Sequence, residues 1–334
     1  MKSEITKLTL DTSSIRNPQS AIRIGITLGD AAGIGPEIVL KALAEPEIGR
    51  ICSPLIIGDK LILEHTAQKV NLLISNEILD LNQFTTLPEP GKISQACGKA
   101  ALAYVEKAVS LCLSKEISAM VTAPIHKEAI HLARSPYPGH TEMIATLTNT
   151  EDYAMMLVGG GLRVILVTIH MGLAKVSATL TPEKILKTIR LAYRATQELG
   201  IPAPKIAVAG FNPHSGEQGL FGDEEQTKIE PAIECAQQEN IPVFGPYPPD
   251  TVFHRAINGD FDIVVCMYHD QGLIPLKTLA FHSGVNITIG LPIVRTSVDH
   301  GTAYDIAGKG IANPLSMIEA IKLAVQFATN RLKN

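Results

Sequence analysis

Short apolar runs alternate with longer stretches of helical periodicity from about Ile22 to the C-terminus, and this alternation constrains the fold more than any other feature. It is typical of βα units built on a parallel or mixed sheet. The predicted strands are Ile22–Leu28, Leu55–Ile57, Ser118–Thr122, Ala154–Val158, Val164–Ile169, Lys205–Ala209, Ile263–Met267 and Asn286–Ile289. The predicted helices are Glu37–Ala44, Lys60–Lys69, Ser94–Ser114, Thr141–Leu147, Pro182–Leu199, Glu224–Gln238, Thr251–Ile257 and Pro314–Arg331.

Composition and charge exclude several classes of protein. Hydrophobic residues make up 46% of the 334 residues and aromatic ones only 4%, which predicts a core of Ile, Leu, Val and Ala around a covered sheet. The net charge is -4 with Lys and Arg scattered, so we expect no nucleic-acid partner. No apolar stretch reaches the roughly 18–20 residues of a membrane span, and the first 20 residues lack the apolar core of a signal peptide. Five cysteines without CxxC spacing indicate buried reduced thiols, and together these features predict a cytoplasmic protein.

Three predicted strands each end at a histidine. The strand Val164–Ile169 is followed directly by His170, the strand Ile263–Met267 by Tyr268 and His269, and Lys205–Ala209 leads shortly afterwards to His214. Ligands bind outside the carboxyl ends of strands in open α/β sheets. Three neutral imidazoles at that edge can hold one divalent metal and leave positions for substrate and water.

A simpler interpretation of these histidines stays open on the residues alone. A histidine after a strand is commonly a hydrogen-bonded loop residue, and the spacings here carry no metal signature. We expect Asp270-Gln271-Gly272 after His269 to form a short polar turn that closes on a ligand.

Several segments offer groups that bind anions. Lys277, Asn286 and Arg295 each lie near the end of an apolar run, and His140 and Thr141 open a predicted helix. Lysine and arginine are natural partners of phosphate and carboxylate, although each taken singly is more often a solvated surface charge.

Two glycine-containing segments could also lie near a ligand. In the turn Gly29–Glu37, Asp30 and Glu37 bring negative charge, so the turn is predicted to have a conformational role and not to bind phosphate. The segment Asp299–Gly310 precedes the last helix, and its glycines permit close approach of the backbone to a ligand.

Taken together, these segments resemble the 4-hydroxythreonine-4-phosphate dehydrogenase (PdxA) family. The matching stretches are GDAAGIGPE (Gly29–Glu37), VTAPIHKEA (Val121–Ala129), PGHTE (Pro138–Glu142), NPHSGE (Asn212–Glu217), MYHDQG (Met267–Gly272) and VRTSVDHGTAYDIAGKG (Val294–Gly310), which span nearly the whole chain in order. The last stretch also looks like the adenosine-binding loop of isocitrate and isopropylmalate dehydrogenases.

The resemblance implies a fold like that of isocitrate and isopropylmalate dehydrogenases, with two α/β domains, mixed or parallel sheets and a cleft between them. Residues 1–135 and 295–334 would form one domain. Residues 136–294 would form a central domain that carries the metal ligands and the interface of a homodimer, with the active site at that interface.

The resemblance also implies roles for individual residues. His170, His214 and His269 match the ligands of a divalent metal, Zn²⁺ first, with Mg²⁺ and Co²⁺ as alternatives. The substrate contacts are His140, Thr141, Lys277, Asn286 and Arg295, and Lys277 is also counted as catalytic. The NAD or NADP site is predicted at Asp299, His300, Gly301, Thr302, Ala303 and Asp305. Asp250 in the turn before a helix is a hypothetical proton acceptor.

Members of this family oxidise the C3 hydroxyl of 4-phosphooxy-L-threonine, and loss of CO₂ then gives 3-amino-2-oxopropyl phosphate for pyridoxal 5'-phosphate synthesis. The segment Met155–Lys175 is closer to a branch that acts on D-threonate or D-erythronate 4-phosphate, which would give dihydroxyacetone phosphate. Two other interpretations are an acyl- or phosphotransferase of related fold, which would not bind NAD, and a catalytically silent sugar-phosphate-binding protein.

Overall fold

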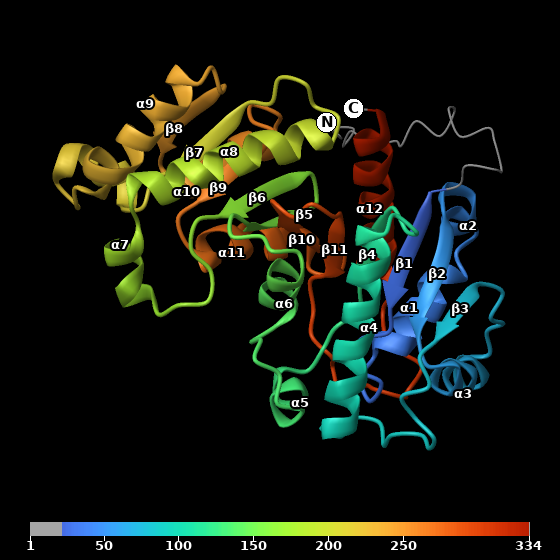
Figure 1. Cartoon of the computed structure of the whole chain (residues 1–334). Coiled ribbons are helices and arrows are strands. Elements are labelled where there is room, and N and C mark those ends of the chain that lie inside the picture. The colour runs from blue at the N-terminus through green and yellow to red at the C-terminus, as the bar shows by residue number, and fades with distance from the viewer. Residues whose placement is uncertain (1–21, 334) are drawn as a thin grey trace, which may run out of the picture.

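The computed structural model describes residues 22–333, so the prediction about the first 20 residues lies outside the described part. The strands form one sheet in the order β3-β2-β1-β4-β11-β10-β5-β6-β9-β7-β8, which runs from right to left in Figure 1. Their bounds are β1 Arg23–Thr27, β2 Ser53–Gly58, β3 Glu77–Asp80, β4 Ala119–Thr122, β5 Ala154–Gly159, β6 Leu162–Leu166, β7 Ile206–Ala209, β8 Val243–Tyr247, β9 Ile263–Cys266, β10 Val285–Ile289 and β11 Arg295–Val298.

Helices cover the sheet and connect its strands. They are α1 Gly35–Leu43, α2 Pro46–Ile51, α3 Lys60–Val70, α4 Gln95–Leu113, α5 Lys127–Leu132, α6 His140–Leu147, α7 Val176–Thr179, α8 Pro182–Glu198, α9 Glu230–Gln238, α10 Pro249–Ile257, α11 His269–Ala280 and α12 Leu315–Lys333, with short helical turns at Leu173–Lys175 (η3), Pro213–Gly219 (η4) and Glu225–Ile229 (η5, a π-turn). None of the helices within residues 22–333 combines the length and the apolar character that crossing a membrane requires.

Strand direction reverses in the middle of the sheet. β3, β2, β1, β4 and β11 are parallel to one another, and β6, β9, β7 and β8 are parallel to one another. Between these two sets, β10 pairs antiparallel with β11 and β5, and β5 pairs antiparallel with β6. The predicted α/β fold with a mixed sheet is therefore confirmed, with all strands in one continuous sheet.

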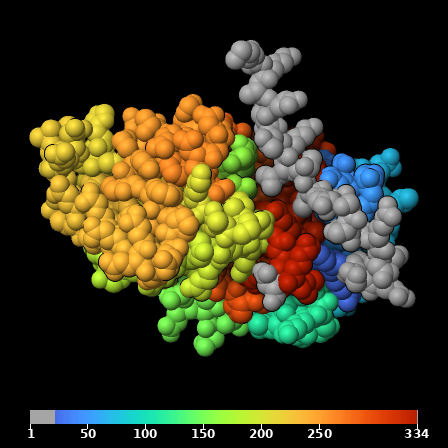
Figure 2. Space-filling model, turned by 90° about the horizontal axis from the view of Figure 1, so that it is seen from above, coloured from blue at the N-terminus to red at the C-terminus, as the bar shows by residue number. Residues whose placement is uncertain are grey.

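The predicted domain boundaries can be compared with this strand order. The strands from residues 1–135 and 295–334 occupy one end of the sheet, and those from 136–294 occupy the other. In Figure 2 the blue N-terminal segments and the yellow and orange central segments lie at opposite ends, with the red C-terminal helix between them. The division into two domains stays a prediction.

Side chains of the central strands point alternately into two hydrophobic cores. Because both faces of these strands are buried, their sequences are short, continuous apolar runs. In β9, Ile263 and Val265 pack into the larger core, which includes Ile185 of α8. Val264 and Cys266 pack into a second core, which includes residues of α10 and α11. The strand is thus buried on both faces, and no polar residue marks an exposed side.

Every predicted strand and helix is present, and the main corrections concern the elements that carry the histidines. The strand before His170 ends at Leu166, not at Ile169. Val167 N–H still donates to Cys266 O (2.9 Å), but the Thr168 hydroxyl donates to Met267 O and replaces the regular ladder. The polar turn predicted after His269 is wrong, because His269 begins α11.

Candidate active site

A cleft of about 850 Å³ lies at the reversal of strand direction. Its residues come from the segments after β4 and β6, the start of α6, the whole length of α11, strands β5, β10 and β11, and the loop that follows β11. Those that the argument uses are Lys127, His140, Thr141, Glu142, His170, His269, Lys277, Asn286, Arg295, Asp299, His300 and Gly301. The structure therefore brings together all five predicted substrate contacts, two of the three predicted metal ligands and three residues of the predicted cofactor loop.

Arg295 places a positive charge beneath the cleft. Its side chain is 3% exposed, and it donates from Nη1 to Thr288 Oγ1 (3.0 Å) and from Nη2 to Thr122 Oγ1 (2.8 Å). No carboxylate among the described residues forms an ion pair with it. Burial lowers the pKa of Arg295 to about 10, opposed by the charge of Glu142. A buried guanidinium held only by hydroxyl groups is suited to an incoming anion.

Buried polar atoms without a partner gather in this cleft. Within residues 22–333, such atoms include His140 Nε2, Asn286 Oδ1, Arg295 Nε and His300 Nε2, and all four residues line the cleft. Buried polar atoms are nearly always hydrogen-bonded, and exceptions call for an explanation such as a ligand. The cleft is therefore a binding site for a polar molecule.

His170 and His269 meet at the edge of the cleft. Their ring centroids are 5.6 Å apart and the rings are inclined by 45°. Burial, followed by the charges of Lys127 and His269, lowers the pKa of His170. His269 Nδ1 lies 2.7 Å from Asp270 Oδ1, which leaves Nε2 available. Two imidazoles that lie side by side, one of them oriented by a carboxylate, fit the requirements of a metal site.

The third predicted ligand, His214, does not line the cleft of its own chain. Within residues 22–333 no group of three His, Cys, Asp or Glu side chains is placed to hold a metal. His214 is exposed on η4, and Asp250 is exposed in the first turn of α10, which packs against η4. Two predicted catalytic residues thus lie on neighbouring elements, and neither lines the cleft.

Lys277 extends from α11 toward the loop after β11. Its Nζ lies 3.1 Å from Asp299 O and 3.4 Å from Asp299 Oδ2. Burial raises the pKa of Asp299, and the charge of Lys277 opposes this shift. The pair fixes the start of the predicted cofactor loop against the predicted substrate site.

Lys127 and Glu142 are charged residues of the cleft that were not predicted as site residues. Lys127 begins α5, and Glu142 lies in the first turn of α6. Both line the cleft, and their charges shift the pKa of His170 in opposite directions, Lys127 lowering it and Glu142 raising it. The stretches VTAPIHKEA and PGHTE contain them, but a charge at a helix start is common on surfaces, so the sequence carried no specific signal.

The predicted cofactor loop has no regular secondary structure and is anchored by the first glycine turn. Tyr304 donates to Asp30 Oδ2 (2.8 Å), and its ring stacks on His126 at 4.7 Å. Glu37 accepts from Gly310 N (3.2 Å) and Ala312 N (2.7 Å).

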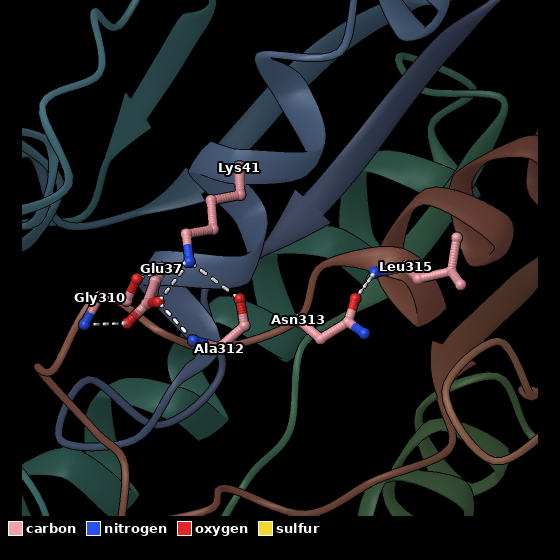
Figure 3. A network of polar contacts seen from close by, with 6 residues as sticks. All are labelled: Glu37, Lys41, Gly310, Ala312, Asn313 and Leu315. Atoms are coloured by element: carbon pink, nitrogen blue, oxygen red, sulfur yellow. Dashed lines mark hydrogen bonds and ion pairs between the residues drawn. The ribbon is translucent and has the colours of Figure 1, made fainter.

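Lys41 completes this anchor from the next turn of α1. Its ammonium group donates to Glu37 and to the carbonyl oxygens of Gly310 and Ala312 (Figure 3). The two carboxylates of the glycine turn therefore bind protein groups, as expected for a conformational role.

The remaining predicted cofactor residues lie just beyond the cleft. Thr302 is buried and its carbonyl oxygen accepts from Ile34 N (3.0 Å), whereas Asp305 is exposed. Ala303 has a φ of 42°. Gly308 and Gly310 border a second, smaller hollow against α1 and α3. The loop thus runs from the main cleft to this hollow.

The fold and the cleft define a protein of the α/β class with a polar ligand site at the reversal of strand direction. The chain superposes on a β-decarboxylating dehydrogenase from Thermococcus kodakarensis with a TM-score of 0.51 over 91% of this chain and 83% of that one, at 14% identity, a likeness in fold alone. Residues 50–324 match the family described as pyridoxal phosphate biosynthetic protein PdxA, and the chain belongs to this family. It is an oxidoreductase of dehydrogenase type that acts on a CH–OH group.

Relatives of similar identity carry two different names. The chain is 49% identical over 324 residues to a 4-hydroxythreonine-4-phosphate dehydrogenase of Desulfosudis oleivorans, covering 91% of this chain and 96% of that protein. It is 47% identical over 325 residues to a D-threonate 4-phosphate dehydrogenase of Cupriavidus necator, covering 92% and 98%. A crystal structure of 4-hydroxythreonine-4-phosphate dehydrogenase from Klebsiella pneumoniae matches with a TM-score of 0.84 at 42% identity, over 92% of this chain and 98% of that one.

Proposed function

We propose that the protein oxidises the C3 hydroxyl of 4-phosphooxy-L-threonine with NAD or NADP, and that loss of CO₂ then yields 3-amino-2-oxopropyl phosphate for pyridoxal 5'-phosphate synthesis. The observation that carries this proposal is the buried Arg295 with its unpartnered Nε, beside the unpartnered atoms of His140 and Asn286. These groups suit a phosphate at one end of the cleft. His170 and His269, which line the same cleft, would lie beside the hydroxyl.

A second candidate substrate is D-threonate or D-erythronate 4-phosphate, which the same steps would convert to dihydroxyacetone phosphate. The specific support is the name of the Cupriavidus necator relative, whose identity to this chain is nearly the same as that of the 4-hydroxythreonine relative. Both candidates carry a phosphate, a hydroxyl and a carboxylate on four carbons, so the cleft would bind them in one orientation.

Different side chains of the cleft would have different roles in this reaction. Arg295, His140, Thr141 and Asn286 would bind the phosphate and so orient the substrate. A divalent metal, with Zn²⁺ as the first expectation, would be held by His170 and His269 together with His214 of a second copy, and it would polarise the substrate oxygen. Lys277 would place positive charge where loss of CO₂ leaves negative charge on the substrate. The loop from Asp299 to Asp305 would hold the dinucleotide.

The placement of His214 and Asp250 favours a homodimer with shared active sites. Both residues are exposed, His214 on η4 and Asp250 on α10, and these two elements pack against each other outside the cleft of their own chain. Exposed apolar side chains lie both near His214 and at the cleft. Leu220 and Phe221 follow His214, and Ile274 and Phe281, which line the cleft, lie on or just after α11. A second copy that covers these side chains would bring its His214 to the cleft.

The substrate proposal is tested by NADH absorbance with each phosphorylated substrate, with and without a chelator. We expect NADH from at least one substrate, loss of activity with the chelator, and recovery when metal is added back. No NADH from any of them with metal present would overturn the proposal and would favour a transferase or a binding protein.

The shared site is tested by mixing two inactive variants, His170→Ala and His214→Ala. If each site combines residues of two chains, random exchange of subunits should restore about a quarter of wild-type turnover, because half the dimers then hold one intact site. If the mixture stays inactive although mixed dimers form, the two histidines do not act in different subunits.

A further inference from the structure

The turn that carries His214 has a backbone conformation that ordinary residues avoid. His214, Ser215, Gly216, Glu217 and Gln218 have φ values of 51°, 53°, 78°, 42° and 58° in succession. Left-handed conformation brings Cβ too close to the following carbonyl oxygen, so it normally occurs at single residues and mostly at glycine. Four of these five residues have a Cβ atom, so the turn persists only if surrounding groups hold it.

The buried carboxylate of Glu225 occupies the inside of this turn. Glu225 is 2% exposed, and its Oε1 accepts from the backbone N–H groups of Phe211 and Asn212, both at 2.7 Å. Its Oε2 accepts from Asn212 Nδ2 at 3.0 Å. A Cβ atom on Gly216 would lie 2.7 Å from the same Oε2, so the carboxylate touches both the entry and the middle of the turn.

The neighbouring Glu224 secures the same asparagine from the other side. Glu224 Oε2 accepts from Asn212 Nδ2 (2.7 Å), and its Oε1 accepts from Ser177 Oγ (2.6 Å). Both glutamates stand at the start of the π-turn η5, which precedes Pro231 of α9. Within residues 22–333 Glu225 forms no ion pair, and its carboxylate accepts from N–H groups of Phe211 and Asn212 just before the turn.

We propose that Glu225 is a positioning residue for His214. By holding the left-handed turn, it fixes the imidazole in an exposed position outside the cleft of its own chain. From there the imidazole can enter the cleft of a second copy. The inference rests on the proposed function, because it assigns Glu225 its role through His214. Glu225 itself lies within the protein and does not line the cleft.

The experiment compares Glu225→Ala and Glu225→Gln with the control Glu217→Gln. Glu217 is an exposed carboxylate of the same turn. Two properties are measured on the full chain: amide hydrogen exchange of residues 211–220, and titration with Co²⁺ followed by its visible absorption. We expect Glu225→Ala to speed exchange in this segment and to weaken Co²⁺ binding roughly tenfold or more, as losing the group that orients a ligand does.

The conservative variant separates positioning from general instability. Glu225→Gln keeps an oxygen that can accept from Phe211 and Asn212, so we expect an intermediate loss of Co²⁺ affinity with an unfolding temperature near that of the wild type. Glu217→Gln should match the wild type in both measurements. If Glu225→Ala fails to fold, Glu225→Gln decides the outcome.

Three results would overturn the inference. Wild-type exchange in the Glu225 variants would show that the carboxylate does not hold the turn, and faster exchange with wild-type Co²⁺ binding would show that the turn does not serve the metal. His214→Ala is titrated in parallel. Wild-type Co²⁺ affinity in that variant would remove the metal role of His214 from the proposed function and this inference with it. A loss in His214→Ala alone would overturn only the role of Glu225.

Discussion

The imidazole ring of His170 lies 5.6 Å from that of His269, measured between centroids. The strands before them, β6 and β9, are parallel neighbours in which Leu166 is opposite Cys266. Neighbouring strands lie about 4.8 Å apart, so the segments that leave them start side by side. Strand pairing therefore brings together two side chains that are distant in the sequence.

His170→Ala should lower turnover roughly 100-fold or more, because the substrate oxygen loses one of the groups that stabilise its developing charge. Binding of NAD should stay close to wild type, since the predicted dinucleotide contacts lie on Asp299–Asp305. Turnover is measured by NADH absorbance and NAD binding by calorimetry, with the exposed His131→Ala as control. An equal loss of NAD binding would contradict the assignment.

Arg295→Met should raise the KM for the phosphorylated substrate roughly 10- to 100-fold, because a charge-assisted hydrogen bond contributes about 1.5–3 kcal/mol. Phosphate should raise the unfolding temperature of the wild type but not of this variant. The control is Arg50→Met, which changes an exposed arginine of α2. An unchanged KM would remove Arg295 from the phosphate site.

Acidification should destabilise the protein partly through His140. Burial, followed by the charge of Arg295, lowers the pKa of His140 well below the usual 6.5. The stabilising contribution is therefore complete above pH 6.5 and is lost as the pH falls toward the folded-state pKa, since only the unfolded chain takes up the proton.

Between pH 7 and pH 5, His140→Gln should lose less unfolding free energy than the wild type, by up to about 1.4 kcal/mol per pH unit. Urea unfolding at each pH measures the slope. His131→Gln changes an exposed imidazole and serves as the matched control. Identical slopes in His140→Gln and wild type would show that His140 is not held neutral.

Glu37→Ala should lower the free energy of unfolding by about 1–3 kcal/mol, because the buried N–H of Ala312 loses its acceptor. It should also raise the KM for NAD more than that for substrate, since Gly310 at the end of the cofactor loop is released as well. Urea unfolding and steady-state kinetics check both effects against Glu45→Ala, an exposed glutamate just after α1. Equal changes in both KM values would argue against a link to the cofactor loop.

Of the five cysteines, Cys235 should react first with a thiol reagent in the native protein. It is exposed on α9, whereas Cys52, Cys97, Cys112 and Cys266 are buried. Burial raises the pKa of Cys52 and of Cys112 to about 12, so little reactive thiolate forms there at neutral pH. Cys235→Ser should abolish the fast phase, and a remaining fast phase would show that a buried site opens readily.

The sequence indicated the apolar strands well and the polar ones poorly. β9 was predicted because its residues are buried on both faces. β11 was missed because its sequence, Arg-Thr-Ser-Val, is polar although every residue is buried. Its polar side chains pair with groups that the chain supplies from elsewhere: Arg295 with Thr288 and Thr122, and Thr296 with Ala320 O. Pairing of this kind is invisible in local periodicity.

α11 was missed for a different reason. Gly272 and Pro275 both disfavour a helix locally. Tertiary packing overrides this preference, since a Cβ atom at Gly272 would lie only 2.9 Å from Leu166 Cδ2, so the glycine lets the helix approach the sheet closely. The Gln271 side chain also connects the helix to the ends of β9 and β7, because it accepts a hydrogen bond from Met267 N and donates one to Gly210 O.

By itself, the sequence indicated the apolar strands, the longer helices and the histidines that follow three strands, because burial imprints a local periodicity on the chain. Only the tertiary structure decided which of these side chains meet. It joined His170 to His269 through the pairing of β6 and β9, added Lys127 and Glu142 to the same cleft, and left His214 facing outward on a left-handed turn. Such meetings depend on strand pairing and on buried hydrogen bonds between distant residues, which local patterns do not encode.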